Sequence, residues 1–394
     1  MPPLHVTAPA CLAAALIGMS QNIQGGANTV LATSLLTPRA NHVSSGDDEN
    51  SCGDFLSSYV LAALLSFASG VLLLLVLNAT DVLGEKCRGQ PVTGMSMPGK
   101  IWEVCGGLIG CSVMMLGLLG LQATGFALTS VLRASATACA SLAIDHIGLC
   151  GTMRRATSDK RVLGLLLLLV GSGLSGSQEL MEEFRAREGA QTAGTSASSI
   201  ASVLCFSLLP LFAGILLPIQ GVVNRRLTTR LGRPLRAVLV SFLGGSLTLA
   251  VTSAMCGAPH DAVVGISHAP WYAFTGGALG LLQVLSNVVL PKYIGFATMA
   301  CFNIFGTLSS ALVVDAVGGF GFVQRPPTAF RIAGVAVALL GAVATRLPSR
   351  PADQPLLAVE LRPQGAVNTS SLRLDCSSGS TSCTVQRTTT EPTV

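Results

Sequence analysis

The chain has 394 residues, of which 50% are hydrophobic and only 11% charged, and its mean hydropathy is +0.62. A water-soluble domain of this composition would need a very large buried core, so a membrane is the simpler environment for these side chains. The formal net charge of +5 would indicate an anionic partner for a soluble protein. Here the basic residues fall between apolar stretches, where they set membrane orientation, and we expect no nucleic-acid partner.

Ten apolar stretches are long enough to cross a lipid bilayer, because a spanning helix needs about 20 mostly apolar residues. In chain order they cover residues 8–35, 58–77, 101–121, 124–145, 162–176, 200–223, 235–256, 271–290, 294–316 and 332–345. The pattern predicts an all-α integral membrane protein with ten transmembrane helices. The first stretch follows no basic segment and contains several amide side chains, so we expect a retained helix and no cleaved signal peptide.

An internal repeat fixes the expected architecture. The first stretch reads GMSQNIQGGANTVLAT from Gly18, and the sixth reads GILLPIQGVVNRRLTT from Gly214. The agreement continues in order through five helices, and equivalent residues include Phe67 and Phe242, Gly106 and Gly276, Gly110 and Gly280, Thr137 and Thr307, Asp145 and Asp315, and Arg161 and Arg331. We therefore expect two copies of one five-helix unit, 1–177 and 200–347, joined by an exposed connector, 178–199, and followed by a disordered cytosolic tail, 348–394.

Loop charges predict how the two units insert. Because each unit has an odd number of helices, the second copy is expected to be inverted relative to the first. With the N-terminus inside, fifteen Lys and Arg residues fall on the cytosolic side and five on the opposite side. The positive-inside rule then predicts a multi-pass protein with both termini in the cytosol, where the sequons at Asn78 and Asn368 stay unglycosylated.

Several segments also resemble a known family. LLPIQGVVNRRL, VSFLGGSLTL, PWYAFTGGALG and RIAGVAVALLGA in the second unit are similar to the five-helix inner-membrane proteins of the drug/metabolite transporter superfamily, and the first unit resembles them more weakly. The resemblance implies the fused ten-helix form of that fold and a role in transport. The fourth helices carry Ala136-Thr137 and Gly306-Thr307 where the family pattern has Gly-Gln. The resemblance therefore carries over no particular solute.

Amide side chains inside the predicted helices are candidates for contact with a solute, because polar groups in a membrane are costly unless they pair or line a cavity. Gln24 and Asn28 in the first helix recur as Gln220 and Asn224 in the sixth. The spacing of four residues places each pair on one helical face. These residues either line a solute path or hydrogen-bond one helix to another.

Arg133 is the sharpest single candidate, because it lies deep in the fourth helix and its equivalent in the second unit is Asn303. A guanidinium group suits a carboxylate or phosphate, so an anionic solute is one hypothesis. The alternatives are an ion pair with Glu103 or contacts with helix-end carbonyls. Gln283 and Asn287, four residues apart in the eighth helix, are further candidates for solute binding.

Asp145 and Asp315 end the fourth helix of each unit, and inversion places them near opposite membrane faces. They either couple transport to an ion or, as the favoured interpretation, cap a turn or bind a neighbouring Arg. The GxxxG spacing of the third and eighth helices indicates close helix packing. Pro218 in the sixth helix either exposes carbonyls to a solute or is a tolerated kink.

The pattern as a whole predicts a secondary carrier or exporter of a small metabolite, working by alternating access between inverted repeats. The expected partners are a small-molecule solute and the lipid bilayer, and a homodimer is compatible with the sequence. No cofactor or metal is expected, because no Cys and His spacing resembles a zinc site and no nucleotide-binding motif is present. The five His residues do not converge as a catalytic set. A non-transporting scaffold or receptor and a nucleotide-sugar carrier are the alternatives.

Overall fold

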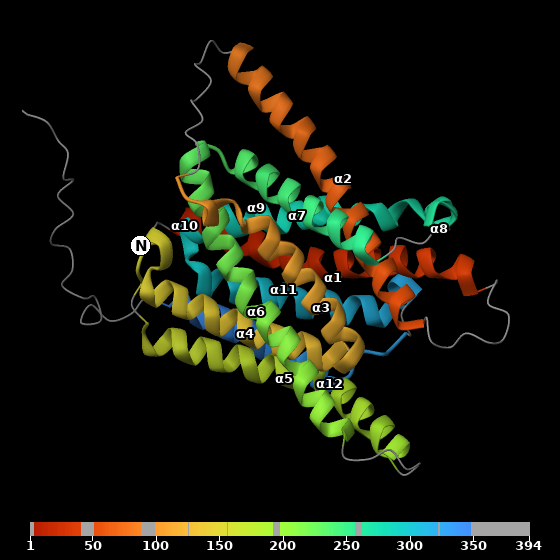
Figure 1. Ribbon diagram of the computed structural model, residues 1–394. Coiled ribbons are helices and arrows are strands. Elements are labelled where there is room, and N and C mark those ends of the chain that lie inside the picture. Colours follow the sequence, from red (N-terminus) through yellow and green to blue (C-terminus); the bar gives the residue numbers. More distant parts are fainter. Residues whose placement is uncertain are drawn as a thin grey trace, which may run out of the picture. The chain divides into compact units, whose positions relative to one another are not determined.

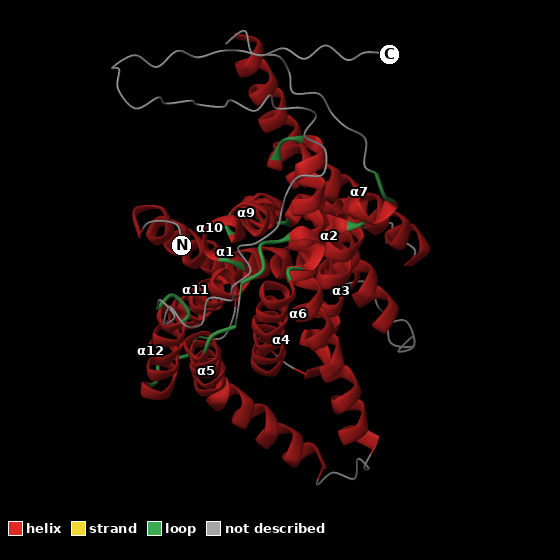
Figure 2. Cartoon of the chain, turned by 90° about the vertical axis from the view of Figure 1, so that its left-hand side faces the viewer, coloured by secondary structure: helices red, strands yellow, loops and turns green. Residues whose placement is uncertain are grey.

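The computed structural model describes residues 4–40, 51–87, 99–124, 126–155, 157–191, 198–256, 262–321 and 324–347. Over these ranges the chain is helical, with short turns and no β-strand (Figure 2). Residues Met1–Ser349 form one compact unit, so the two repeats pack together as a single body. The predicted cytosolic tail, 348–394, lies outside the described residues.

Ten helices of 14 to 37 residues account for most of the described chain (Figure 1). The first repeat contains α1 (Leu4–Ala40), α2 (Ser51–Cys87), α3 (Gly106–Thr124), α4 (Phe126–Ile147) and α5 (Asp159–Gln191). The second contains α6 (Ser198–Leu231), α7 (Pro234–Cys256), α9 (Gly276–Val289), α11 (Phe296–Val317) and α12 (Ala329–Ala344), with the short helices α8 (Ala262–His268) and α10 (Pro291–Ile294) between them.

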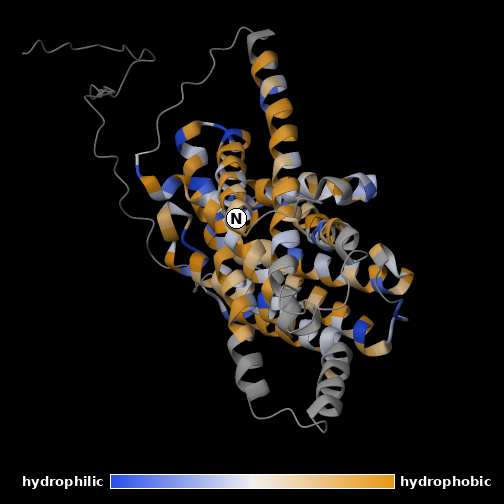
Figure 3. Ribbon diagram, turned by 45° about the vertical axis from the view of Figure 1, so that its right-hand side comes forward, coloured by the Kyte–Doolittle hydropathy of each residue, from blue (hydrophilic) through white to orange (hydrophobic). Residues whose placement is uncertain are grey.

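The apolar surface of these helices fits a membrane. Seven described helices are long and apolar enough to cross a bilayer, and α3 and α12 contribute shorter apolar segments. Figure 3 shows hydrophobic residues along the helices and many of the hydrophilic ones near their ends. Large apolar side chains such as Leu72, Leu247 and Leu340 are more than 60% exposed, which is expected where lipid tails and not water surround the protein.

The expected connector is mostly helical. Helix α5 continues through Gln191, and α6 begins at Ser198, so only residues 192–197 of this region lie outside the described residues. The segment ELMEEFRAR is rich in residues with high helix propensity. Composition predicted a linker, but local helix propensity extends the fifth helix.

Equivalent helices of the two repeats contact each other in antiparallel pairs, which is the direct sign of inversion. Helices α2 and α7 meet through Phe67 and Phe242, equivalent residues whose ring centroids lie 5.0 Å apart. Helices α4 and α11 also pack together, with Ile144 close to Phe296 and Ala138 close to Cys301. Residue numbers rise along one helix as they fall along the other, as a twofold relationship between the repeats requires.

Helices α5 and α12 form the third antiparallel pair, and glycine allows their backbones to touch. A Cβ atom on Gly164 would lie 2.6 Å from the carbonyl oxygen of Gly341, and one on Gly171 would lie 2.6 Å from that of Gly334. Gly164 is equivalent to Gly334, and Gly171 to Gly341, so the same contact occurs twice. Leu168, at the centre of this interface, is fully buried. Small residues permit this close approach in lipid.

The remaining helices interleave across the repeats. Helix α1 packs against α9 and α11 of the second repeat, and α6 packs in the same way against α3 and α4 of the first. Each first helix therefore has most of its contacts with the other copy. This arrangement places the polar faces of α1 and α6 between the two repeats.

The α5–α12 contact predicts a matched pair of stability effects. Gly171→Ala should lower stability by about 1–3 kcal/mol, because the new methyl group overpacks a backbone contact that has no room for it. Gly173→Ala on the same helix is the control, because nothing lies within 4 Å of its Cβ position. Thermal unfolding of both variants in detergent measures the difference. Equal unfolding temperatures would contradict the close α5–α12 packing.

Candidate functional site

A cavity of about 450 Å³ lies between the two repeats. Its walls come from α1, α2, α3 and α4 of the first repeat and α6, α7, α9 and α11 of the second, and none of the described lining residues belongs to α5 or α12. The Phe67–Phe242 pair forms part of an apolar wall with Met114 and Leu217. Amide and hydroxyl groups supply most of the polar surface.

Seven of the ten residues that the sequence singled out line this cavity, and the structure brings them together from five helices. They are Gln24, Asn28, Arg133, Gln220, Gln283, Asn303 and Asp315. The other three, Asn224, Asn287 and Asp145, lie in the described structure but outside the lining. All three are at least 97% buried and serve contacts behind the cavity wall.

The amides of α1 and α6 fit against glycines of the opposite repeat. Asn224 lies against Gly106, so closely that a Cβ atom there would collide with its Oδ1 atom, and Asn28 lies against Gly276 in the same way. Gln220 and Gln24 stand one turn away, against Gly110 and Gly280. The two glutamines therefore both pack a helix contact and face the cavity.

Asn224 packs between α6 and α3 and lies outside the cavity lining. Its side chain is fully buried, and neither its amide nitrogen nor its carbonyl oxygen has a hydrogen-bond partner among the described residues. The Oδ1 atom faces the backbone of Gly106, where a weak Cα–H···O contact is the available interaction. The glycines of the GxxxG motifs in α3 and α9 lack side chains and so leave depressions in the helix surface, which we call glycine notches. The amide side chains of α6 and α1 fit into them.

A chain of amides runs behind the second-repeat wall. Asn303 Nδ2 donates to Gln283 Oε1 at 3.3 Å, and Gln283 Nε2 donates to Asn287 Oδ1 at 3.3 Å. Asn287 thus supports Gln283 from behind. Asn303 is thereby held by a partner on the neighbouring helix, although it also lines the cavity.

The first repeat has no equivalent of this chain of amides. Arg133 stands at the position of Asn303, Val113 at that of Gln283 and Gly117 at that of Asn287. A Cβ atom on Gly117 would lie 3.7 Å from Arg133 Nη1, so glycine leaves space beside the guanidinium. No hydrogen bond or ion pair of that guanidinium is found among the described residues, and Arg133 lines the cavity.

Glu103, the alternative partner expected for Arg133, contacts other residues. Glu103 is 1% exposed, accepts a hydrogen bond from the Gly99 amide at 3.0 Å, and lies 3.6 Å from the guanidinium groups of both Arg226 and Arg230. Glu103 therefore ties the start of α3 to the end of α6. It leaves Arg133 to face the cavity.

Thr137 and Thr307 were not candidates, although both have roles at the cavity wall. Thr137 Oγ1 donates to the carbonyl oxygen of Gly214 at 3.0 Å, and Thr307 Oγ1 donates to that of Gly18 at 3.1 Å. Pro218 has no N–H for the Gly214 carbonyl, so Thr137 satisfies an acceptor that the proline leaves open. Helix α6 is therefore continuous through Pro218. The equivalence of Thr137 and Thr307 in the repeat was the sequence signal that could have identified these two residues.

Asp145 joins the end of α4 to the start of α11. Its carboxylate is 2% exposed and accepts hydrogen bonds from the backbone amides of Phe296, at 2.9 Å, and Ala297, at 3.1 Å. A carboxylate at this position caps the helix and complements its dipole. Arg155, in the loop after α4, lies nearby: burial lowers the pKa of its guanidinium, and the Asp145 charge opposes that shift.

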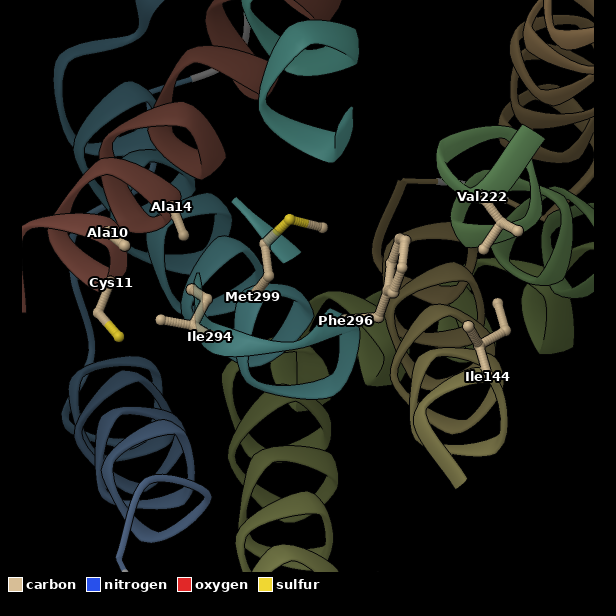
Figure 4. Close-up of a cluster of buried hydrophobic side chains, with 8 residues drawn as sticks. All are labelled: Ala10, Cys11, Ala14, Ile144, Val222, Ile294, Phe296 and Met299. Carbon is tan, nitrogen blue, oxygen red and sulfur yellow. The ribbon is translucent and has the colours of Figure 1, made fainter. Parts of the chain in front are cut away.

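The ring of Phe296 extends this contact into an apolar seal. Figure 4 shows Phe296 between Met299 on one side and Ile144 and Val222 on the other. The ring is 1% exposed. Helices α4, α6 and α11 therefore pack together around this ring at the Asp145 end.

Asp315, the equivalent of Asp145, has a different partner. Its carboxylate forms an ion pair with Arg331 of α12 and lines the cavity, as does Arg325 from the following loop. The two aspartates therefore occupy equivalent places in the repeats but not equivalent environments. No group of three or more potential metal-ligating side chains is found within the described part of the chain.

Comparisons with known proteins agree with this architecture. The sequence pattern of the family described as "Putative inner membrane exporter, YdcZ" matches residues 51–174 and 205–344, once in each repeat. No curated protein matches the chain. A solved structure titled "Crystal structure of protein" is similar with a TM-score of 0.51 and 16% sequence identity, over 87% of this chain and 96% of that chain, and this likeness shows the fold alone. The chain therefore belongs to this family of inner-membrane exporters, as a multi-pass membrane transporter that carries the five-helix unit twice.

Proposed function

We propose that the chain exports a small anionic solute by alternating access, and that the solute binds in the cavity between the two repeats. The observation that carries this proposal is the Arg133 guanidinium, which faces the cavity without a protein partner among the described residues. A charged side chain inside a membrane protein is costly unless it is paired or lines a cavity. Arg133 is partly exposed to this cavity, so the site is suited to a ligand that brings the negative charge.

The size and polarity of the cavity support a small metabolite. About 450 Å³ falls within the usual range for sites that enclose small molecules. Phe67 and Phe242 offer an apolar surface, and Gln24, Gln220 and Gln283 offer amide donors and acceptors. A solute with a short apolar portion and one acidic group matches these features.

The charge of the lining favours an anion over a cation. The ionisable side chains among the described lining residues are Arg133, Arg325 and Asp315, and the Asp315 carboxylate already pairs with Arg331. The balance around the cavity is therefore positive. Desolvation inside the protein strengthens the attraction of such a site for a carboxylate or phosphate.

Substitution of Arg133 tests the proposal. In reconstituted vesicles, Arg133→Gln should lower the uptake of a transported carboxylate or phosphate ester by at least about tenfold, since a charge-assisted hydrogen bond is lost. Arg133→Lys should keep part of the activity, because the charge stays but the planar fork is lost. Normal transport by both variants would contradict the anion hypothesis. Binding without counterflow for every solute in the panel would instead favour a non-transporting scaffold.

Gly117 provides a second test of the same site. Gly117→Asn should place an amide oxygen beside Arg133 and so give the guanidinium an internal partner, which raises KM for the solute by about tenfold. Gly117→Ala is the matched control, because its methyl group makes only ordinary contact at 3.7 Å and accepts no hydrogen bond. Equal KM values for the two variants would show that solute binding does not depend on an Arg133 guanidinium without an internal partner.

We also propose that both termini lie in the cytosol, in keeping with the loop charges. The structure offers two native reporters, the exposed free thiols of Cys150, after α4, and Cys256, at the end of α7. A membrane-impermeant maleimide added to intact cells should modify Cys256 and spare Cys150, as peptide mass spectrometry can establish. Modification of Cys150 with protection of Cys256, or a glycan on Asn78, would reverse the orientation.

A further inference from the structure

The two ends of the cavity are built from the same turn. After α4, the backbone amide of Arg155 donates to the Asp145 carbonyl at 2.7 Å, and after α11 that of Arg325 donates to the Asp315 carbonyl at 2.8 Å. The glycines that end the two helices, Gly148 and Gly318, both have positive φ, 74° and 66°. Inversion places these identical turns at opposite ends of the molecule.

Among the described residues, the contacts of the two carboxylates in these turns differ. Asp145 holds the amides of Phe296 and Ala297, whereas Asp315 holds Arg331. Arg161 occupies in the first repeat the position of Arg331, so Asp145 also has an arginine available to it. Each aspartate thus has two candidate partners, a cation on the fifth helix of its own repeat and the first turn of the fourth helix of the other repeat.

The choice of partner coincides with the state of the cavity. Val314, Asp315 and Arg325 line it, but their equivalents Ile144, Asp145 and Arg155 do not. Among the described residues, the cavity therefore reaches the Asp315 end and is sealed at the Asp145 end. The seal is the α4–α11 contact, which combines the two Asp145 hydrogen bonds with the buried ring of Phe296.

Glycine makes the seal possible. Gly295, immediately before α11, has φ +84°, and a Cβ atom there would lie 2.7 Å from Asp145 Oδ2. An L side chain at this position would be strained and would also push the carboxylate away from the helix end. The closed end thus depends on a carboxylate, two amides and one glycine.

We propose that Asp145 and Asp315 are alternating gate residues. In the present state Asp145 caps α11 and closes one end, while Asp315 is held by Arg331 and the cavity reaches the other end. In the opposite state Asp315 caps the first turn of α4, which begins at Phe126, and Asp145 pairs with Arg161. This inference rests on the proposed alternating access, and it assigns positioning roles to the two aspartates and requires no ion binding by them.

Hydrogen–deuterium exchange of the full chain in lipid nanodiscs tests the gate without any solute. Asp145→Ala should speed exchange of the Phe296 and Ala297 amides by at least about tenfold, because two charge-assisted hydrogen bonds are lost. The same variant should slow exchange in the first turn of α4, as the population shifts to the opposite state. Asp145→Asn keeps one acceptor and should have a smaller effect.

Arg331→Gln gives the decisive second variant, because it acts at the far end of the cavity. It removes the present partner of Asp315, so it should also speed exchange at Phe296 and Ala297 although it touches neither. Asp159→Asn, an exposed acid of α5, is the control and should leave all rates unchanged. A merely structural cap would respond to Asp145→Ala locally, with no change in α4 and no effect of Arg331→Gln, and that result would overturn the proposal.

Solute flux, measured separately, distinguishes this inference from the proposed function. Reciprocal exchange with no flux for any solute would refute transport but leave the two-state gate in place. Normal flux in Asp145→Ala with unchanged exchange at both ends would refute the gate and leave transport in place.

Discussion

The fit of amide side chains into glycine notches is the contact on which the rest of the structure depends. Asn224 and Gln220 of α6 lie against Gly106 and Gly110 of α3, and the same fit occurs between α1 and α9. In lipid there is no hydrophobic force to draw helices together, so close packing and polar contacts must do so. Because each repeat supplies both the amides and the notches, neither can complete its contacts alone. The repeats must interleave, and the cavity lies where they meet.

Duplication makes the scaffold symmetric, but the site within it is not. The second repeat keeps an amide chain of Asn303, Gln283 and Asn287, in which each side chain satisfies the next. The first repeat has Arg133 beside Gly117, so a cation stands where an internally satisfied amide would be. Symmetry can thus serve the motion of the two halves, while the departure from symmetry serves recognition of the solute.

The two ends of the cavity also differ, but this asymmetry does not come from the sequence, because the residues at the two ends are alike. Asp145 and Asp315 lie in turns of the same geometry, yet one caps a helix and the other forms an ion pair. Two inverted copies cannot both be closed if the solute is to reach the cavity. A single conformation therefore has to break the symmetry, and the proposed gate describes how the same residues would exchange roles.

The sequence alone determined the helical membrane fold, the duplication and the set of buried polar residues, because hydrophobic length and a repeated order of Gly, Asn, Gln and Asp are local features of the chain. It also predicted inversion from the odd helix count, and the antiparallel α2–α7, α4–α11 and α5–α12 pairs agree with it. Only the tertiary structure decided which amides face the cavity, since Asn224 and Gln220 share one helical face but differ in what lies opposite them. It likewise decided that Glu103 binds arginines of α6 and that Arg133 faces the cavity with no partner among the described residues, because the pairing of charges distant in sequence depends on how the helices pack.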